Sequence, residues 1–206
     1  MPDTNKIDPA AETGHEPRAA EKILNVARDL FYRQGIRAIG VDEIVRTAGV
    51  TKPSLYRSFP SKDELAASYL RYYDREFWAR FDEAVAAHPG DPRAQILAFL
   101  TRVGKRTQKP GYRGCGMTNA VVEYPEHDHP ARLVSEENKR ELRRRLRAMA
   151  KAMGASEPDT LGDGLLLLIE GAYISGQLFG AGGPARTVAR NAELLIDASL
   201  AKPGRA

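Results

Sequence analysis

The chain is poor in the features that build disulfide-linked or membrane-spanning proteins. Its 206 residues include one cysteine, Cys115, so no disulfide can form within the chain. The most apolar stretch, residues 165–169, lies between Asp163 and Glu170 and is too short to cross a bilayer. Residues 1–17 lack the apolar core of a secretion signal. These absences favour a protein of the reducing cytoplasm that does not enter membranes.

Motifs of common enzyme classes are also missing. The patterns GxSxG, HExxH and CxxC do not occur, and Gly114-Cys115-Gly116 is too short for a phosphate-binding loop. His127-Asp128-His129 resembles a fragment of a metal site, but no third ligand follows at a defined spacing. We therefore predict no catalytic residue, no metal and no cofactor, and keep a small helical enzyme as the alternative.

No run of residues alternates apolar and polar side chains for long enough to predict a strand. Apolar residues recur instead at spacings of three and four, beginning with Ile23, Ala27, Leu30 and Phe31. Gly35 should end that first helix in a left-handed conformation. The periodicity predicts an all-α protein of about nine helices.

Capping residues, glycines and prolines mark the expected boundaries. Gly49 should end the second helix, Thr51 should cap the third, and Ser61 with Glu64 forms a capping-box pattern at the start of a long fourth helix. The six remaining helices are expected at 61–87, 92–108, 115–124, 130–153, 158–181 and 185–201. We divide the chain into a disordered tail (1–17), a helix-turn-helix DNA-binding domain (18–62) and a helical domain (63–206).

The basic charge is concentrated in the three short helices. Residues 17–62 contain nine lysines and arginines against four acidic residues, an excess of five, whereas the whole chain has a net charge of +4. Phosphate binding requires such an excess. A helix-turn-helix unit that binds double-stranded DNA is therefore predicted here.

Residues 35–65 resemble the DNA-binding region of the TetR family of transcriptional regulators. The matching elements are Ala48-Gly49-Val50, the Leu55-Tyr56-x-x-Phe59 spacing and Ser61-Lys62-x-Glu64-Leu65. Gly40 departs from the pattern, because the family usually has serine or threonine there as a helix cap. Beyond residue 70 the resemblance lies in helix number and length alone.

The resemblance implies which residues meet DNA. Lys52 and Ser54 would approach base edges, Tyr56 and Lys62 would reach phosphates, and Arg57 could do either. The alternative is that the basic residues form only a solvated face. The expected DNA-binding set is Arg18, Thr51, Lys52, Pro53, Ser54, Tyr56, Arg57 and Lys62.

The resemblance also implies a ligand-responsive repressor that binds a palindromic operator as a homodimer and is released by a small, largely apolar effector. An architectural DNA binder without an effector is the second alternative. Effector contacts are expected from apolar side chains with polar ones among them. The candidates are Tyr73, Phe77, Trp78, Phe81, Phe99, Val103, Cys115, Asn119, Val122, Glu123, Tyr173 and Gln177. Cys115 is expected to be a buried or pocket-lining thiol, with a redox sensor as the alternative.

The family's dimer elements correspond to the helices near 158–181 and 185–201. The first carries small residues four apart, Ala172, Gly176 and Gly180, which would let another helix approach closely. The second carries Val188 and Leu195, with Ser199, on one side. We predict dimerisation through these faces; ordinary packing within one chain is the alternative.

Overall fold

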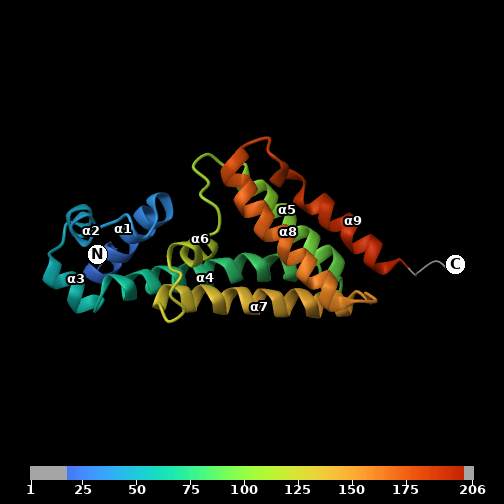
Figure 1. The fold of residues 1–206 in the computed structure, drawn as a ribbon, viewed down its shortest axis with the longest axis horizontal. Helices are drawn as coiled ribbons and strands as arrows, with labels where there is room; N and C mark the ends of the chain where they lie inside the picture. The colour runs from blue at the N-terminus through green and yellow to red at the C-terminus, as the bar shows by residue number, and fades with distance from the viewer. Residues whose placement is uncertain (1–17, 202–206) are drawn as a thin grey trace, which may run out of the picture.

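The structure is a computed structural model that describes residues 18–201; the expected tail at 1–17 lies outside the described residues. Within them the predicted all-α class is confirmed, with nine α-helices, one short 3-10 helix and no strand (Figure 1). The helices are α1 (Ala19–Gln34), α2 (Val41–Ala48), α3 (Lys52–Ser58), α4 (Lys62–Ala86), α5 (Pro92–Thr107), α6 (Gly116–Glu123), α7 (Pro130–Ala152), α8 (Pro158–Phe179) and α9 (Val188–Leu200), with η1 (Pro184–Thr187) before α9.

Local capping chemistry sets several of these ends. The Thr51 hydroxyl accepts a hydrogen bond from the backbone N–H of Ser54 at 3.4 Å, and Ser61 accepts one from Glu64 at 3.0 Å. Gly49 ends α2 in the predicted left-handed conformation, with φ 65° and ψ 35°. The last helix begins at Val188 rather than at 185, because residues 184–187 form the 3-10 turn.

The predicted left-handed conformation of Gly35 is wrong. Its φ is 94° and its ψ is 153°, so the backbone leaves α1 extended instead of curling back on the helix. This conformation is open to glycine and few other residues. It carries the chain towards α6, where the Glu123 carboxylate accepts a hydrogen bond from the backbone N–H of Arg37 at 2.8 Å.

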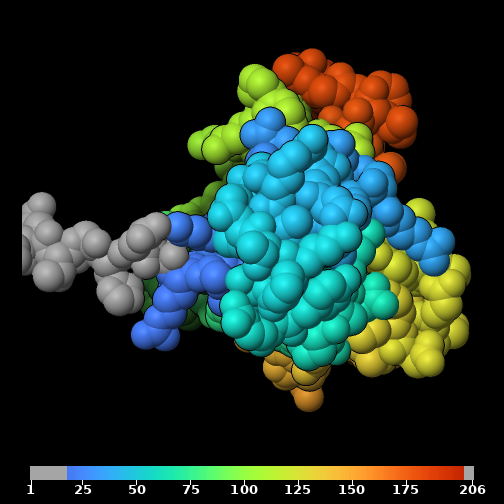
Figure 2. All heavy atoms as spheres, turned by 90° about the vertical axis from the view of Figure 1, so that its left-hand side faces the viewer, coloured from blue at the N-terminus to red at the C-terminus, as the bar shows by residue number. Residues whose placement is uncertain are grey.

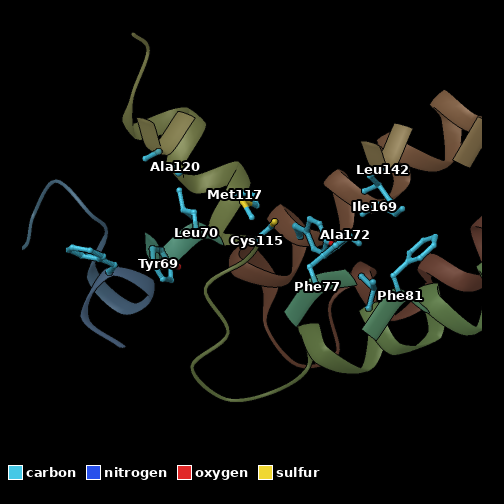
Figure 3. Packing of buried hydrophobic residues seen from close by; sticks show 14 of the residues in the cluster. Tyr69, Leu70, Phe77, Phe81, Cys115, Met117, Ala120, Leu142, Ile169 and Ala172 are labelled. Carbon is cyan, nitrogen blue, oxygen red and sulfur yellow. The ribbon is translucent and has the colours of Figure 1, made fainter. Parts of the chain in front are cut away.

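The helices form two unequal groups along one long axis. Figure 1 shows α1, α2 and α3 clustered at one end, with α4 running from that cluster beside α7, and α5, α8 and α9 at the other end. One continuous core joins the groups. Phe31 of α1 packs edge-on against Tyr69 of α4, with ring centroids 5.8 Å apart. Figure 3 shows the buried side chains, including Leu70 and Phe77 of α4, that continue this core into the larger group.

The packing of α7 on α8 depends on a close approach of the two backbones. A Cβ atom on Gly162 would lie 2.8 Å from the backbone nitrogen of Arg147 and 2.7 Å from its Cα. Beside this contact, Arg143 and Arg147 both donate hydrogen bonds to the Asp163 carboxylate, with N–O distances of 2.6 to 2.8 Å. These two guanidinium groups hold the pKa of Asp163 well below its usual range.

We expect Gly162→Ala to destabilise the protein by about 1–3 kcal/mol, because the new methyl group has backbone on its far side and cannot displace it. Gly104→Ala is the matched control, since its Cβ would meet neighbours at an ordinary 3.4–3.5 Å. Alanine should be neutral there or stabilising by up to about 1 kcal/mol. Chemical denaturation of both variants measures the difference; equal stabilities would contradict the close approach.

Candidate DNA-binding surface and effector cavities

The third helix presents its polar side chains to solvent and its apolar ones to α1 and α2. Leu55 is fully buried, whereas Lys52, Tyr56 and Arg57 are exposed. Figure 2 looks onto this end of the molecule, where residues of α2 and α3 form the nearest surface. The structure therefore brings the predicted DNA-binding residues of α3 together on one open face, which is what docking into a DNA groove requires.

Hydrogen bonds organise this face. The Ser54 hydroxyl lies 3.1 Å from the Thr51 hydroxyl and accepts a hydrogen bond from the Arg57 guanidinium at 3.0 Å. Lys52 is 2.7 Å from the Asp42 carboxylate of α2, and this hydrogen bond raises the pKa of the lysine. Lys62 donates to the carbonyl of Arg37 at 3.3 Å. Partial burial lowers the pKa of Lys62.

The predicted effector residues separate into two groups and two outliers. Tyr73, Phe77, Phe99, Val103 and Tyr173 line one cavity of about 40 Å³ between α4, α5 and α8, which we call the inner cavity. The others that share a site line a groove of about 470 Å³ between the end of α1, α6 and α8; they are Cys115, Asn119, Val122, Glu123 and Gln177, again with Tyr173.

Trp78 and Phe81 line neither of these sites. Phe81 is buried and packs edge-on against Phe99, with centroids 4.9 Å apart. Trp78 faces a separate groove between α4 and α7, where the Arg145 guanidinium lies 4.0 Å from the centre of its ring. Its edge-on contact with Phe77, at 4.9 Å between centroids, is its link to the inner cavity.

The sequence prediction missed the basic side chains around the inner cavity. Arg80, Arg102 and Arg106 line it together with Tyr112. Arg80 and Arg106 also line a larger pocket of about 450 Å³, open towards α1. A helical signal was present, because Tyr73, Phe77 and Arg80 are spaced by four and three, as are Phe99, Val103 and Arg106.

Cys115 is buried at the edge of the groove and lies beside a partly buried polar cluster. The Lys139 ammonium is 3.4 Å from its sulfur and 2.6 Å from the carboxylate of Glu170, which also accepts a hydrogen bond from Thr118 at 2.7 Å. Burial alone would lower the pKa of Lys139, but Cys115 and Glu170 outweigh it and the pKa is raised.

In the His127-Asp128-His129 segment, both histidines contact neighbouring residues of the fold. His129 stacks on Tyr124 with centroids 3.6 Å apart, and its Nδ1 accepts a hydrogen bond from the backbone N–H of Ala131 at the start of α7. His127 lies 3.6 Å from the carboxylate of Glu136. Across residues 18–201, no three histidine, cysteine or acidic side chains are grouped as metal ligands.

The small-residue stripe faces into its own chain, which corrects the prediction that it forms a dimer surface. A Cβ atom on Gly176 would lie 2.7 Å from the Tyr112 ring and 2.8 Å from the side chain of Thr107. Ala172 is buried, and Gly180 ends α8 with a φ of 60°. Gly176 therefore accommodates the end of α5 and the loop after it, whereas Gly180 has open space around it and serves the end of the helix.

The same two helices leave a different apolar face uncovered. On α8, Leu167, Ile174 and Leu178 are 72%, 53% and 69% exposed, and Gly171 between them has open space around it. On α9, Leu194 is 52% exposed, whereas the predicted Val188 is buried and Leu195 packs on Gly164. We call Leu167, Gly171, Ile174, Leu178 and Leu194 the open apolar face.

The geometry defines a class: a helix-turn-helix DNA-binding protein with a helical domain behind it. Residues 23–69 match the family model described as bacterial regulatory proteins, tetR family. Two solved structures are similar over most of the chain. A TetR transcriptional regulator of Streptomyces avermitilis is 33% identical with a TM-score of 0.78, covering 89% of this chain and 98% of that one. A TetR-family regulator of Streptomyces coelicolor is 29% identical with a TM-score of 0.79, covering 89% and 94%.

Curated relatives agree. The transcriptional repressor KstR2 of Rhodococcus jostii is 32% identical over 93 residues, which is 45% of each chain; the chain thus spans less than half the length of this and other first relatives. The regulator AcuR of Cereibacter sphaeroides is 25% identical over 78% of this chain and 77% of its own. This chain belongs to the TetR family of transcriptional regulators.

Membership confirms the prediction of a DNA-binding regulator of transcription and sets the helical enzyme aside, since proteins of this family are non-enzymatic. No helix in the described part of the chain is long and apolar enough to cross a membrane.

We expect Lys139→Met to destabilise the fold by about 1–3 kcal/mol, because it leaves the Glu170 carboxylate without its cation in a largely buried place. Adding Glu170→Gln should restore much of the loss. The control is Arg33→Met, whose ion pair with Asp29 has side chains 70% and 59% exposed and should contribute less than about 0.5 kcal/mol. Urea denaturation compares them; a double variant no more stable than Lys139→Met would contradict the pairing.

Proposed function

We propose that this protein is a repressor that binds a palindromic operator as a homodimer and leaves it when a small effector binds. The observation that carries the proposal is the unbroken α4. It starts at Lys62, capped by Ser61, shortly after α3 ends at Ser58, and its later turns line the inner cavity through Tyr73, Phe77 and Arg80. We assign DNA binding to residues 18–62, and effector binding and dimerisation to residues 63–206.

On DNA, Lys52 and Ser54 would contact bases, and Tyr56 and Lys62 would contact phosphates; Arg57 would serve either role. Thr51 and Pro53 complete the edge of α3 that enters the groove, and Arg18 would reach the backbone from the start of α1. In the free protein Lys52 pairs with the Asp42 carboxylate at 2.7 Å, and at the operator its ammonium would exchange this partner for a base acceptor.

The homodimer proposal rests on the open apolar face. A stripe of leucine and isoleucine on two neighbouring helices is the kind of surface that a second copy covers, and a two-fold axis lets each copy bury the same residues. α8 and α9 pack side by side, so two copies would form a bundle of four helices. A bacterial regulator that binds its operator acts in the cytoplasm, where we place this protein.

Induction would depend on the contacts between the two groups of helices. Glu123 of α6 accepts the N–H of Arg37, and the Tyr32 hydroxyl accepts the N–H of Arg113 at 3.0 Å. A ligand in the groove or cavities would favour one arrangement of these contacts. It would thereby change the distance between the α3 helices of the two subunits. An architectural DNA binder would need neither cavity nor groove.

Selecting genomic fragments with the purified protein tests the operator. We expect a footprint with an inverted repeat whose half-sites lie about one DNA turn or slightly more apart, on the order of 34–36 Å. A footprint without an inverted repeat would rule out symmetric binding by a homodimer.

Two lysine variants separate the roles at the operator. Lys52→Ala should cost about 1–3 kcal/mol on the best site and flatten the ranking of operator variants, because it removes a base contact. Lys62→Ala should weaken binding to all sequences alike and make the salt dependence shallower by about one counterion. Lys151→Ala, at the far end of α7, is the control and should change neither. An unchanged ranking with Lys52→Ala would refute its assignment.

A charge on the open apolar face should separate the subunits. Leu178→Glu places two carboxylates across the two-fold interface and should give a monomer at micromolar concentration in analytical ultracentrifugation, with helix content retained. Leu133→Glu is the control, because Leu133 is 50% exposed on α7 and away from this face. A dimer that survives Leu178→Glu, or a parent protein that is already monomeric, speaks against this interface.

A further inference from the structure

The pocket open towards α1 is rich in arginine and tyrosine, and we call it the arginine pocket. Its walls come from three helices: Arg28 and Tyr32 from α1, Tyr73 and Arg80 from α4, and Arg106 from α5. It shares Tyr73, Arg80 and Arg106 with the inner cavity. The two spaces therefore meet at the same three side chains, with an open polar part in front and an apolar part behind.

The cations of this pocket outnumber the carboxylates free to neutralise them. Asp29 is held by Arg33, outside the pocket, at 2.7 Å. Glu76 lies 3.5 Å from Arg80. Among the residues that the structure describes, Arg106 has no carboxylate at ion-pair distance; its surroundings are the hydroxyls and rings of tyrosines.

Arg80 and Arg106 also act on one another. Burial lowers the pKa of Arg80, and the charge of Arg106 lowers it further. Burial acts on Arg106 in the same direction, but the oxygens of Tyr73, Tyr32 and Tyr112 outweigh it, so the pKa of Arg106 is raised. Both guanidinium groups line the arginine pocket. An anion there would stabilise both charges, because it accepts hydrogen bonds from both groups at once.

The remaining walls suit a flat apolar body. Tyr32, Tyr69, Tyr72 and Tyr73 line the pocket, and Arg28 already stacks on the ring of Tyr72 at 3.3 Å. The volume of about 450 Å³ lies in the usual range for small-molecule sites. The inner cavity, about 40 Å³ with Phe77 and Phe99 around it, is too small for more than a short apolar group.

We propose that the arginine pocket binds a small aromatic carboxylic acid, with the carboxylate held by Arg106 and Arg80 and the ring against the tyrosines. The planar guanidinium fork matches a carboxylate in two parallel hydrogen bonds. This deepens the proposed function and rests on it for its regulatory consequence. Because Arg28 and Tyr32 belong to α1, the acid would bridge the DNA-binding unit and the α4–α5 pair and so fix their relative placement.

Calorimetry with paired probes tests the site directly. The probes are benzoate, phenylacetate and 3-phenylpropanoate, each with its neutral amide. We expect at least one acid to bind the parent about tenfold or more tightly than its amide, since the amide lacks the charge-assisted hydrogen bonds. Arg106→Gln and Arg80→Gln should each erase most of this preference. Lys105→Gln removes a charge from the same helix outside the pocket and should keep it.

Folding is checked by melting temperature, and Arg106→Lys is measured beside the glutamine variant; it retains the charge but not the fork and should give an intermediate preference. The proposal is overturned if no acid binds the parent more tightly than its amide, or if the preference survives in both glutamine variants.

Gel shifts on the selected operator separate this inference from the proposed function. Acids that bind through Arg106 but leave operator affinity unchanged would support the site and refute induction through it. Neutral apolar compounds that release the operator equally from the parent and from Arg106→Gln would support induction and refute the carboxylate site. Release by an acid in the parent and in Lys105→Gln, but not in Arg106→Gln, is the result expected if both are correct.

Discussion

The arrangement depends on one continuous helix shared by both parts of the molecule. α4 has 25 residues and is therefore about 37 Å long. Its first turn, capped by Ser61, follows α3 almost without a loop. Its later turns carry Phe77 and Phe81, whose edge-on contacts with Phe99 fix it to α5. A well-packed helix resists bending, so a displacement at the aromatic end is carried to the DNA-binding end.

Outside this helix, several polar contacts join the two parts. Glu123 holds the backbone of Arg37, Tyr32 bridges the backbone of Arg113 and Gly114, and the Arg37 side chain pairs with Glu126 at 3.3 Å. Exposed or half-exposed pairs of this kind contribute little each, and they can be exchanged for other partners at low cost. The apolar core thus sets what stays fixed, while polar contacts set an orientation that a ligand or an operator can adjust.

The arginine pocket lies where these two kinds of contact meet. Its back wall is the α4–α5 pair, and its front wall is α1, which packs on α4 through Phe31 and contacts the loop before α6 through Tyr32. Burial and the charge of Arg106 lower the pKa of Arg80 there, and a charged group perturbed in this way inside a pocket is typical of a ligand site.

Local sequence determined the helices and the helix-turn-helix unit of α1, α2 and α3. The caps at Thr51 and Ser61, the left-handed Gly49 and the buried Leu55 depend on neighbours a few residues away, so the pattern along the chain was sufficient. The tertiary structure alone decided which helical face meets which neighbour. Ala172 and Gly176 were predicted to form a surface for a second chain, but Ala172 is buried and Gly176 packs on Tyr112 and Thr107. Arg80 and Arg106 share a pocket because of the angle at which α4 packs on α5, and a crossing angle depends on whole interlocking surfaces that the spacing of residues on one helix does not encode.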